Sequence, residues 1–188
     1  MPDPLMRASH LASNVKALDA LGDEASARIR ERCAKPIATI EASIRTAWLP
    51  LELDVSLTGA VEEIAGLERA RRWGRDAIAE SGRGPLLGPI LTALRRVGLS
   101  PHAALRRVPY GWTLIYRHCG APRYERVDEG AAAIVVDGVP EAMREPSYLR
   151  GIAAALDGVV ELGGGVETFT ELSVDGDVVR FDCRWSRG

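Results

Sequence analysis

Residues 166–185 read VETFTELSVDGDVVRFDCRW, and this stretch carries the clearest hairpin signal of the chain. Its two flanking segments, 166–174 and 178–185, are rich in β-branched and aromatic residues, which favour strands. The Asp175-Gly176-Asp177 sequence between them is typical of a tight β-turn, because glycine and aspartate tolerate the positive φ angles that such turns require. The stretch therefore predicts an antiparallel hairpin.

A second pair of short strands is predicted upstream, at 123–127 and 131–136, joined by a turn at Asp128-Glu129-Gly130. Between the two pairs, residues 147–162 place apolar side chains at helical spacing, and Gly163-Gly164-Gly165 ends that helix as a C-cap and tight turn. The resulting order β-β-α-β-β predicts a four-stranded antiparallel sheet with helices on one face.

The first two thirds of the chain is predicted to be helical, from apolar spacing and from capping residues. The predicted helices are 15–21, capped by Ser13, and 24–33, 37–48, 51–64, 67–81, 85–97 and 101–116, the last bent at Pro109. Residues 1–7 contain two prolines and little periodicity, and we expect them to be disordered. The fold class is therefore α+β: a single domain over residues 1–188, with a helical part at about 9–118 packed on a ββαββ part at about 119–186.

Charge and cysteine usage exclude several classes of protein. The 24 basic residues nearly balance the 26 acidic residues, so there is no bulk attraction to nucleic acid. No apolar run reaches the roughly 18 residues of a membrane span, and the amino end does not resemble a secretory signal. Three widely spaced cysteines do not predict a disulfide framework. We expect a soluble, cytoplasmic protein.

No catalytic or metal-binding motif is present among the polar residues. His118-Cys119 offers two metal ligands, but adjacent side chains seldom reach the same ion. The alternative is that His118 is a polar residue at the end of a helix and Cys119 is a small buried apolar group. His10 lies near a start that we expect to fray. The arginine pairs 71–72, 95–96 and 106–107 either form an anion-binding patch or lie on solvated helix faces. We therefore expect a protein that is not an enzyme, with no metal and no cofactor.

The aromatic residues supply the candidate binding site. Trp112 and Tyr116 are four residues apart and share one face of a predicted helix. They either anchor the core or line a ligand cavity between helix and sheet. Together with Trp48 and Trp73 they form the candidate pocket for a small apolar ligand.

Several short motifs resemble a known family. The first motif is Trp48-Leu49-Pro50-Leu51, which enters a helix, and the second is Gly74-Arg75-Asp76 followed by Ala79-Glu80-Ser81. The third consists of Pro109, Trp112 and Tyr116 before a glycine. A helix rich in small residues around Gly151 and a last strand ending in Arg184-Trp185 complete the set. Over residues 45–186 the chain resembles a paralogous myxobacterial family of unknown function. That family lies in the superfamily of ligand-binding domains of nitric-oxide signalling and Golgi transport, which includes haem–nitric-oxide-binding, vinyl-reductase-type and TRAPP-like domains.

The resemblance implies helices on a four-stranded antiparallel sheet, dimerisation through the helical layer and a regulatory role. It does not imply haem, because the Tyr-x-Ser-x-Arg clamp of the haem-binding branch is missing. The vinyl-reductase-type branch carries cysteines in its last hairpin, where this chain keeps only Cys183, with Thr170 and Glu171 near the other position.

Three functions remain open at this point. The first is a non-enzymatic signalling or adaptor domain that acts by dimerising, as a homodimer or a heteromer, and by contacting other proteins. The second is a sensor that binds a small apolar ligand between helices and sheet. The third is a hydrolase or transferase whose site has no sequence signature. A filled interior with an apolar surface patch favours the first, a cavity lined by the aromatic residues favours the second, and a cleft with clustered titratable groups favours the third.

Overall fold

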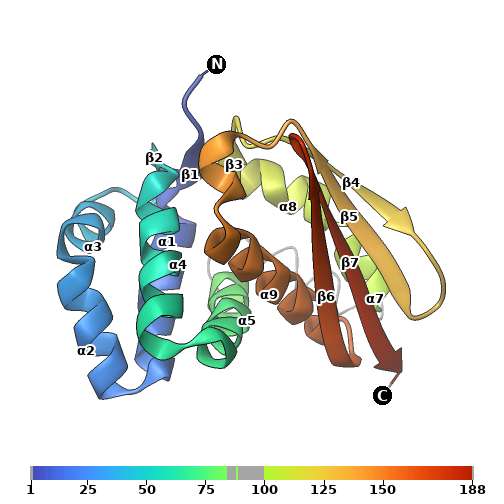
Figure 1. The fold of residues 1–188 in the computed structure, drawn as a ribbon, viewed down its shortest axis with the longest axis horizontal. Coiled ribbons are helices and arrows are strands. Elements are labelled where there is room, and N and C mark those ends of the chain that lie inside the picture. The colour runs from blue at the N-terminus through green and yellow to red at the C-terminus, as the bar shows by residue number, and fades with distance from the viewer. Residues whose placement is uncertain (1, 84–87, 89–99, 188) are drawn as a thin grey trace.

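A computed structural model describes residues 2–83, 88 and 100–187 of the chain. Figure 1 shows a four-stranded sheet at one end of the molecule and a layer of helices at the other, with one long helix between them. The described helical elements are α1 (Ala8–Ala17), η1 (Leu18–Leu21), α2 (Asp23–Arg32), α3 (Ala34–Glu41), α4 (Glu52–Ala65), α5 (Leu67–Arg83), α7 (Pro101–Leu105), α8 (Val108–Ile115), η2 (Glu141–Arg144) and α9 (Pro146–Leu162).

The carboxyl-terminal half confirms the predicted ββαββ order and the α+β fold class. Its strands are β4 (Ala121–Arg126), β5 (Ala131–Asp137), β6 (Gly165–Asp175) and β7 (Val178–Arg187), and all neighbours pair antiparallel in the order β4-β5-β7-β6. The hairpin turn brings Asp175 opposite Val178, as the sequence predicts. Gly163 caps α9 and Gly164 has a φ of +83°, which agrees with the predicted tight turn.

One face of this sheet is apolar and the other carries ion pairs. Along β7 the side chains of Val179, Phe181 and Cys183 are buried against the helices. The alternate residues Arg180 and Asp182 pair with each other at 2.9 Å on the outer face. This period of two is what a half-buried strand requires. Helices α7, α8 and α9 contact the inner face, and α9 separates the sheet from α5 and the helices beyond it.

A second, three-stranded sheet was not predicted. Its strands are β1 (Leu5–Arg7), β2 (Trp48–Pro50) and β3 (Tyr116–Arg117), with β1 in the centre. The expected disorder of residues 1–7 is therefore wrong for residues 5–7, because β1 pairs with both neighbours and buries Met6 completely.

Three predicted helices have different bounds. The first begins at Ala8, so Ser13 lies inside it and its hydroxyl donates to the Ser9 carbonyl instead of capping. The third ends at Glu41, which leaves Ile44 74% exposed and Trp48 in a strand. The predicted helix 101–116 is interrupted at Arg106–Arg107, because Pro109 has no amide hydrogen to donate to the Leu105 carbonyl and is instead accommodated in the first turn of a new helix. The predicted helix 85–97 and the pair Arg95-Arg96 lie outside the described residues.

Other boundaries follow the sequence. Ser100 caps α7 by accepting a hydrogen bond from the Ala103 amide at 3.2 Å, with Pro101 at the first helical position. Gly22 and Gly66 follow η1 and α4 with φ angles of +79° and +82°. No helix in the part of the chain that the structure describes is long and apolar enough to cross a membrane.

Helices α5 and α9 pack closely because small residues line their contact. A Cβ atom at Gly74 would lie 2.9 Å from the Ala154 Cβ, and one at Gly158 would lie 3.2 Å from the Arg75 Cα. Arg71 of α5 completes the contact, since its guanidinium lies 3.3 Å from the buried carboxylate of Asp157 on α9. The arginine pair 71–72 is therefore not an open anion-binding patch.

The substitution Gly74→Ala should separate these helices. We expect it to lower the free energy of unfolding by about 1–3 kcal/mol, since overpacking outweighs the gain in helix propensity. Gly59→Ala in α4 is the matched control, because its new Cβ would lie 3.6 Å from the Ser147 hydroxyl, an ordinary contact. Urea unfolding of both variants tests this, and equal stability of the two would contradict the packing account.

Candidate functional site

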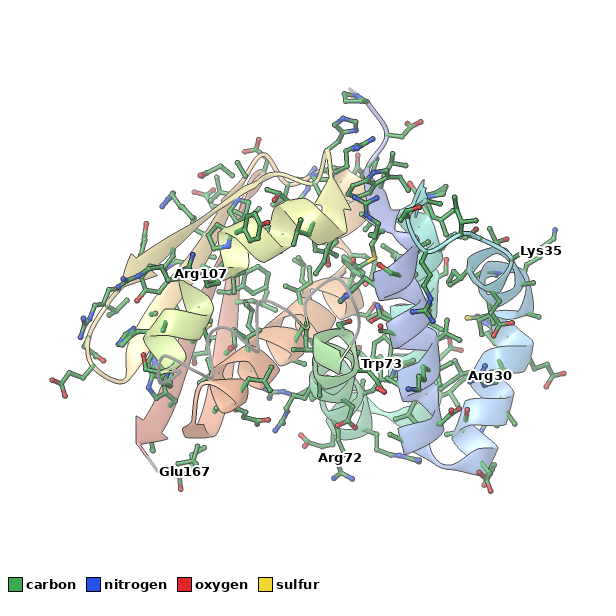
Figure 2. The ribbon with its side chains drawn as sticks, turned by 180° about the vertical axis from the view of Figure 1, so that it is seen from behind. Arg30, Lys35, Arg72, Trp73, Arg107 and Glu167 are labelled. Carbon is green, nitrogen blue, oxygen red and sulfur yellow. The ribbon has the colours of Figure 1, made fainter. Side chains whose placement is uncertain are left out.

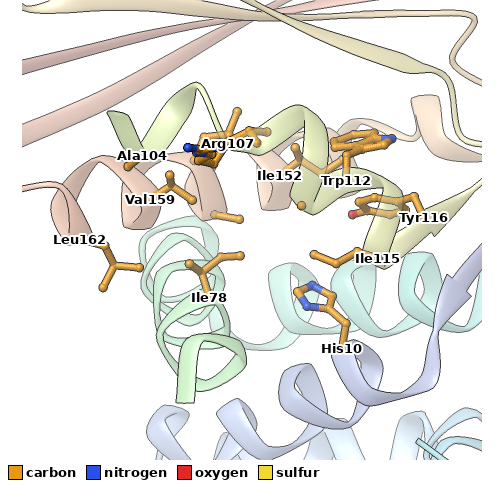
Figure 3. Close-up of a pocket in the computed structure, with 14 residues that line it drawn as sticks. His10, Ile78, Ala104, Arg107, Trp112, Ile115, Tyr116, Ile152, Val159 and Leu162 are labelled. Atoms are coloured by element: carbon orange, nitrogen blue, oxygen red, sulfur yellow. The ribbon is translucent and has the colours of Figure 1, made fainter. Parts of the chain in front are cut away.

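An apolar cavity of about 140 Å³, which we call the outer cavity, lies among the helices. Figure 3 shows side chains from α1, α5, α7, α8 and α9 converging on it, together with Tyr116 of β3. Its apolar wall is formed mainly by Val108, Trp112 and Ile115 of α8 and by Ile152, Leu156, Val159 and Leu162 of α9. The four-stranded sheet contributes none of the described lining residues, so the expected position between helix and sheet is corrected to a position between helices.

Helical spacing explains how the two walls form. Val108, Trp112 and Ile115 follow one another at intervals of four and three residues, and so do Ile152, Leu156 and Val159. Such residues share one face of a helix. The opposite face of α9 packs on the sheet, so this helix is buried on both sides.

Trp112 and Tyr116 lie side by side at the outer cavity, as the sequence predicted, although Tyr116 belongs to β3 and not to a helix. Their ring centroids are 4.3 Å apart. Within the described residues, the buried indole nitrogen of Trp112 has no hydrogen-bond partner.

The other two candidate residues do not line the outer cavity. Trp73 is buried on α5 and faces α1 (Figure 2). Its indole nitrogen donates a hydrogen bond to the main-chain carbonyl of Asn14 at 3.1 Å. Trp48 is in β2, where the guanidinium groups of Arg7 and Arg117 lie 3.9 and 4.4 Å from its ring centroid. Trp48 borders neither the outer cavity nor the smaller space next to it. The four aromatic residues therefore do not form one site.

A smaller and more polar space, the inner chamber, adjoins the outer cavity. Its volume is about 40 Å³, and five residues line both spaces: His10, Ile78, Tyr116, Ile152 and Ala155. The side chains that distinguish the inner chamber are Asn14, Asp54, Thr58, Trp73 and Tyr148. Trp73 is one of the predicted pocket residues, whereas sequence reasoning missed Asn14, Asp54, Thr58 and Tyr148.

Asp54 is the centre of this chamber. Its carboxylate is buried and accepts a hydrogen bond from the Asn14 amide nitrogen at 2.8 Å, and Tyr148 lines the same chamber. The Tyr148 and Tyr116 hydroxyl oxygens are 3.2 Å apart. Burial raises the pKa of Asp54 to about 6, against the lowering effect of Asn14 and Tyr148. Burial also raises the pKa of both tyrosines, which therefore stay protonated.

His10 is buried beside this cluster, so the expectation of a frayed start is wrong. Its Nδ1 atom lies 2.9 Å from the Ser81 hydroxyl oxygen. Figure 3 shows the ring on α1 directed toward the outer cavity. Burial lowers the pKa of the imidazole to about 4, so His10 is neutral at physiological pH.

The remaining histidine and cysteine candidates do not converge. His118 follows β3 with a φ of +57° and does not close a helix; its Nδ1 atom lies 3.1 Å from the Asp3 carbonyl oxygen. Burial raises the pKa of the Cys119 thiol to about 11, as expected for a small buried group. Among the residues with described positions, no three histidine, cysteine or acidic side chains are arranged to hold a metal ion.

The two buried titratable groups should make opposite contributions to stability in acid. The pKa of His10 is about 4 in the folded protein against an ordinary value of 6.5. The protein therefore loses the stability that His10 contributes as the pH falls from about 6.5 to about 4. The pKa of Asp54 is about 6 in the folded protein against an ordinary value of 3.8. The protein therefore gains stability from Asp54 as the pH falls from about 6 to about 3.8. Each contribution is on the order of 3 kcal/mol, so they offset each other in the wild type.

Asp54→Asn should therefore make the protein more sensitive to acid. We expect the variant to lose about 3 kcal/mol more stability than the wild type between pH 7 and pH 4, because only the His10 contribution remains. His10→Asn should have the reverse effect. Urea unfolding at a series of pH values provides the measurement, and parallel pH profiles for the wild type and Asp54→Asn would contradict this assignment.

Comparisons with known proteins place the fold. No protein-family model matches the chain, and no curated protein matches it. Solved structures of H-NOX proteins do match over nearly its whole length. A structure that probes haem distortion in the H-NOX family has a TM-score of 0.65 at 13% identity, covering 97% of this chain and 96% of that one.

Two further structures give the same result. An oxygen-binding H-NOX domain related to soluble guanylate cyclases has a TM-score of 0.62 at 14% identity, covering 97% of this chain and 96% of its own. An unliganded Fe(II) H-NOX protein from K. algicida has a TM-score of 0.59 at 9% identity, covering 97% and 98%. The chain therefore has the H-NOX fold.

Proposed function

We propose that this chain is a non-enzymatic signalling domain that senses a small apolar molecule bound in the outer cavity. The observation that supports it best is the cavity itself, about 140 Å³ in volume and walled by apolar side chains of α8 and α9. An engineered cavity of about 150 Å³ lined by leucine, isoleucine and phenylalanine binds benzene or xenon. A ligand of that size is therefore the class that the cavity suits.

The bound ligand would act by linking helices. It would contact α8 on one side and α9 on the other, with Ile78 of α5 and His10 of α1 on the remaining walls. A ligand that binds one arrangement of these helices more tightly shifts the population toward it. Because α9 also packs on the sheet, such a shift would reach both ends of the molecule.

The walls do not fit haem, although the matching structures include an oxygen-binding H-NOX domain and one that probes haem distortion. A cavity of about 140 Å³ is smaller than the roughly 300–1,000 Å³ of most organic-ligand sites. Haem also carries two carboxylates, and Arg107 is the single basic residue in the described lining. The contact of His10 Nδ1 with Ser81 leaves Nε2 available to a metal, so the mismatch with haem rests on the size and charge of the cavity. The proposal therefore involves no haem.

A second candidate function is the adaptor that acts by dimerisation. It is favoured by the exposed apolar side chains of Val166, Phe169 and Val174, which lie on the edge strand β6. An edge strand offers unpaired backbone groups to a second copy of the chain. Analytical ultracentrifugation of the wild type and of Phe169→Lys tests it: a dimer that the substitution dissociates supports this function, and a monomeric wild type excludes a homodimer.

Toluene binding tests the sensor proposal. We expect saturable binding by calorimetry, and at ten times the dissociation constant a stabilisation of about 1.4 kcal/mol, or roughly 3–5 °C in Tm. Ala155→Leu should abolish this binding without loss of stability, because Ala155 lines the cavity and the added carbons fill it. Ala38→Leu is the control, since it adds the same side chain at an exposed position of α3. Unchanged toluene binding by Ala155→Leu, or none by the wild type, would contradict the proposal.

A further inference from the structure

The inner chamber differs chemically from the outer cavity that it adjoins. About 40 Å³ exceeds the roughly 10–15 Å³ that one water needs and matches a single polar group of a ligand. The outer cavity is apolar, whereas Asn14, Asp54 and Tyr148 line the chamber. The two spaces have Tyr116 and Ile152 in common, so a molecule with an apolar body in the first can extend a polar end into the second.

Most of the hydrogen-bond donors of the chamber are already used. The Asn14 amide nitrogen donates to Asp54, and that pairing fixes the orientation of the amide because a carboxylate only accepts. The Tyr116 and Tyr148 hydroxyl oxygens are 3.2 Å apart, so one of the two phenols donates its hydrogen to the other. The indole nitrogen of Trp73 donates to the main-chain carbonyl of Asn14, not to its side chain.

What remains in the chamber is acceptor capacity. The Asn14 Oδ1 atom is buried and has no hydrogen-bond partner among the described residues. The Tyr116 oxygen keeps at least one free acceptor lone pair, whichever of the two phenols donates to the other. A chamber of this kind suits a group that brings several donors.

The charge in the chamber is also uncompensated. Asp54 is 3% exposed, and no arginine, lysine or histidine of the described chain forms an ion pair with it. A buried carboxylate without a cation is unfavourable, and for that reason its pKa is raised. A cationic group at this position would remove the cost.

We propose that the inner chamber binds the primary ammonium group of a small amine whose apolar body occupies the outer cavity. An ammonium brings three donors and one positive charge, which match the Asp54 carboxylate, the Asn14 Oδ1 atom and the Tyr116 oxygen. A hydroxyl brings one donor and leaves the carboxylate unpaired. The inference rests on the proposed sensor function, since it needs the outer cavity to hold the body of the ligand.

Three probes with the same body and different ends test this: ethylbenzene, 2-phenylethanol and 2-phenylethylamine. Calorimetry at pH 7.5 on the full chain should give an amine affinity about 10- to 100-fold above that of ethylbenzene, because hydrogen bonds to a charged group contribute about 1.5–3 kcal/mol. Asp54→Asn should reduce amine affinity to that of ethylbenzene and leave ethylbenzene binding unchanged. Asp23→Asn, which removes the same charge at an exposed position, should retain the preference.

The outcomes separate this inference from the function on which it rests. Binding of ethylbenzene with equal or weaker binding of the amine would overturn the ammonium site and keep the sensor. Tighter binding of the alcohol than of the amine would overturn it too, as would an amine preference that survives Asp54→Asn. If none of the three probes binds, the sensor function itself fails. Should Asp54→Asn not fold, the wild-type series alone decides.

Discussion

The close contact between α5 and α9 is the constraint on which the rest of the structure depends. Glycine at 74 and 158 lets the two backbones approach, and the ion pair between Arg71 and Asp157 holds them together. Because α9 lies so near α5, its other face remains free to pack on the inner face of the sheet. One helix thus joins the amino-terminal helices to the sheet.

The same arrangement produces the cavity. Helix α8 follows α7 across the inner face of the sheet, and its apolar side chains meet those of α9 without filling the space between them. Polar residues of α1 and α4 lie behind that space, where Asn14 holds Asp54 and the tyrosine pair extends the chain of hydrogen bonds. A buried neutral imidazole and a buried carboxyl are unfavourable in a core of this size, and their position beside a cavity is typical of a binding site. The proposed binding would therefore depend on the same few side chains as stability.

Much of the fold could be predicted because its signals are local. The turns at 128–130 and 175–177 and the Ser100 cap each depend on the conformational preferences of one or two residues. The three-stranded sheet could not be predicted, since strands of two or three residues are too short to show a period. Trp48 was misplaced for this reason: a helical pattern continued by chance into a strand.

The candidate site was predictable only in part. Trp112 and Tyr116 were found because aromatic residues four apart are conspicuous, and they do meet. His10 and Asn14 are also four apart, but that spacing has meaning only if the first helix begins at Ala8, before the predicted start. In the sequence Asp54 resembles any acidic residue in the first turn of a helix, where a solvent-exposed negative charge interacts favourably with the helix dipole. Its burial depends on Asn14 and Tyr148, which are distant in sequence.

The central claim is that the space between α8 and α9 is a dry, ligand-sized cavity. The most direct measurement is a crystal structure determined under xenon pressure, because xenon enters apolar cavities and scatters strongly. The account predicts a xenon atom bordered by Trp112, Ile152 and Val159. Ordered water molecules at that position, or side chains that close the space, would contradict it.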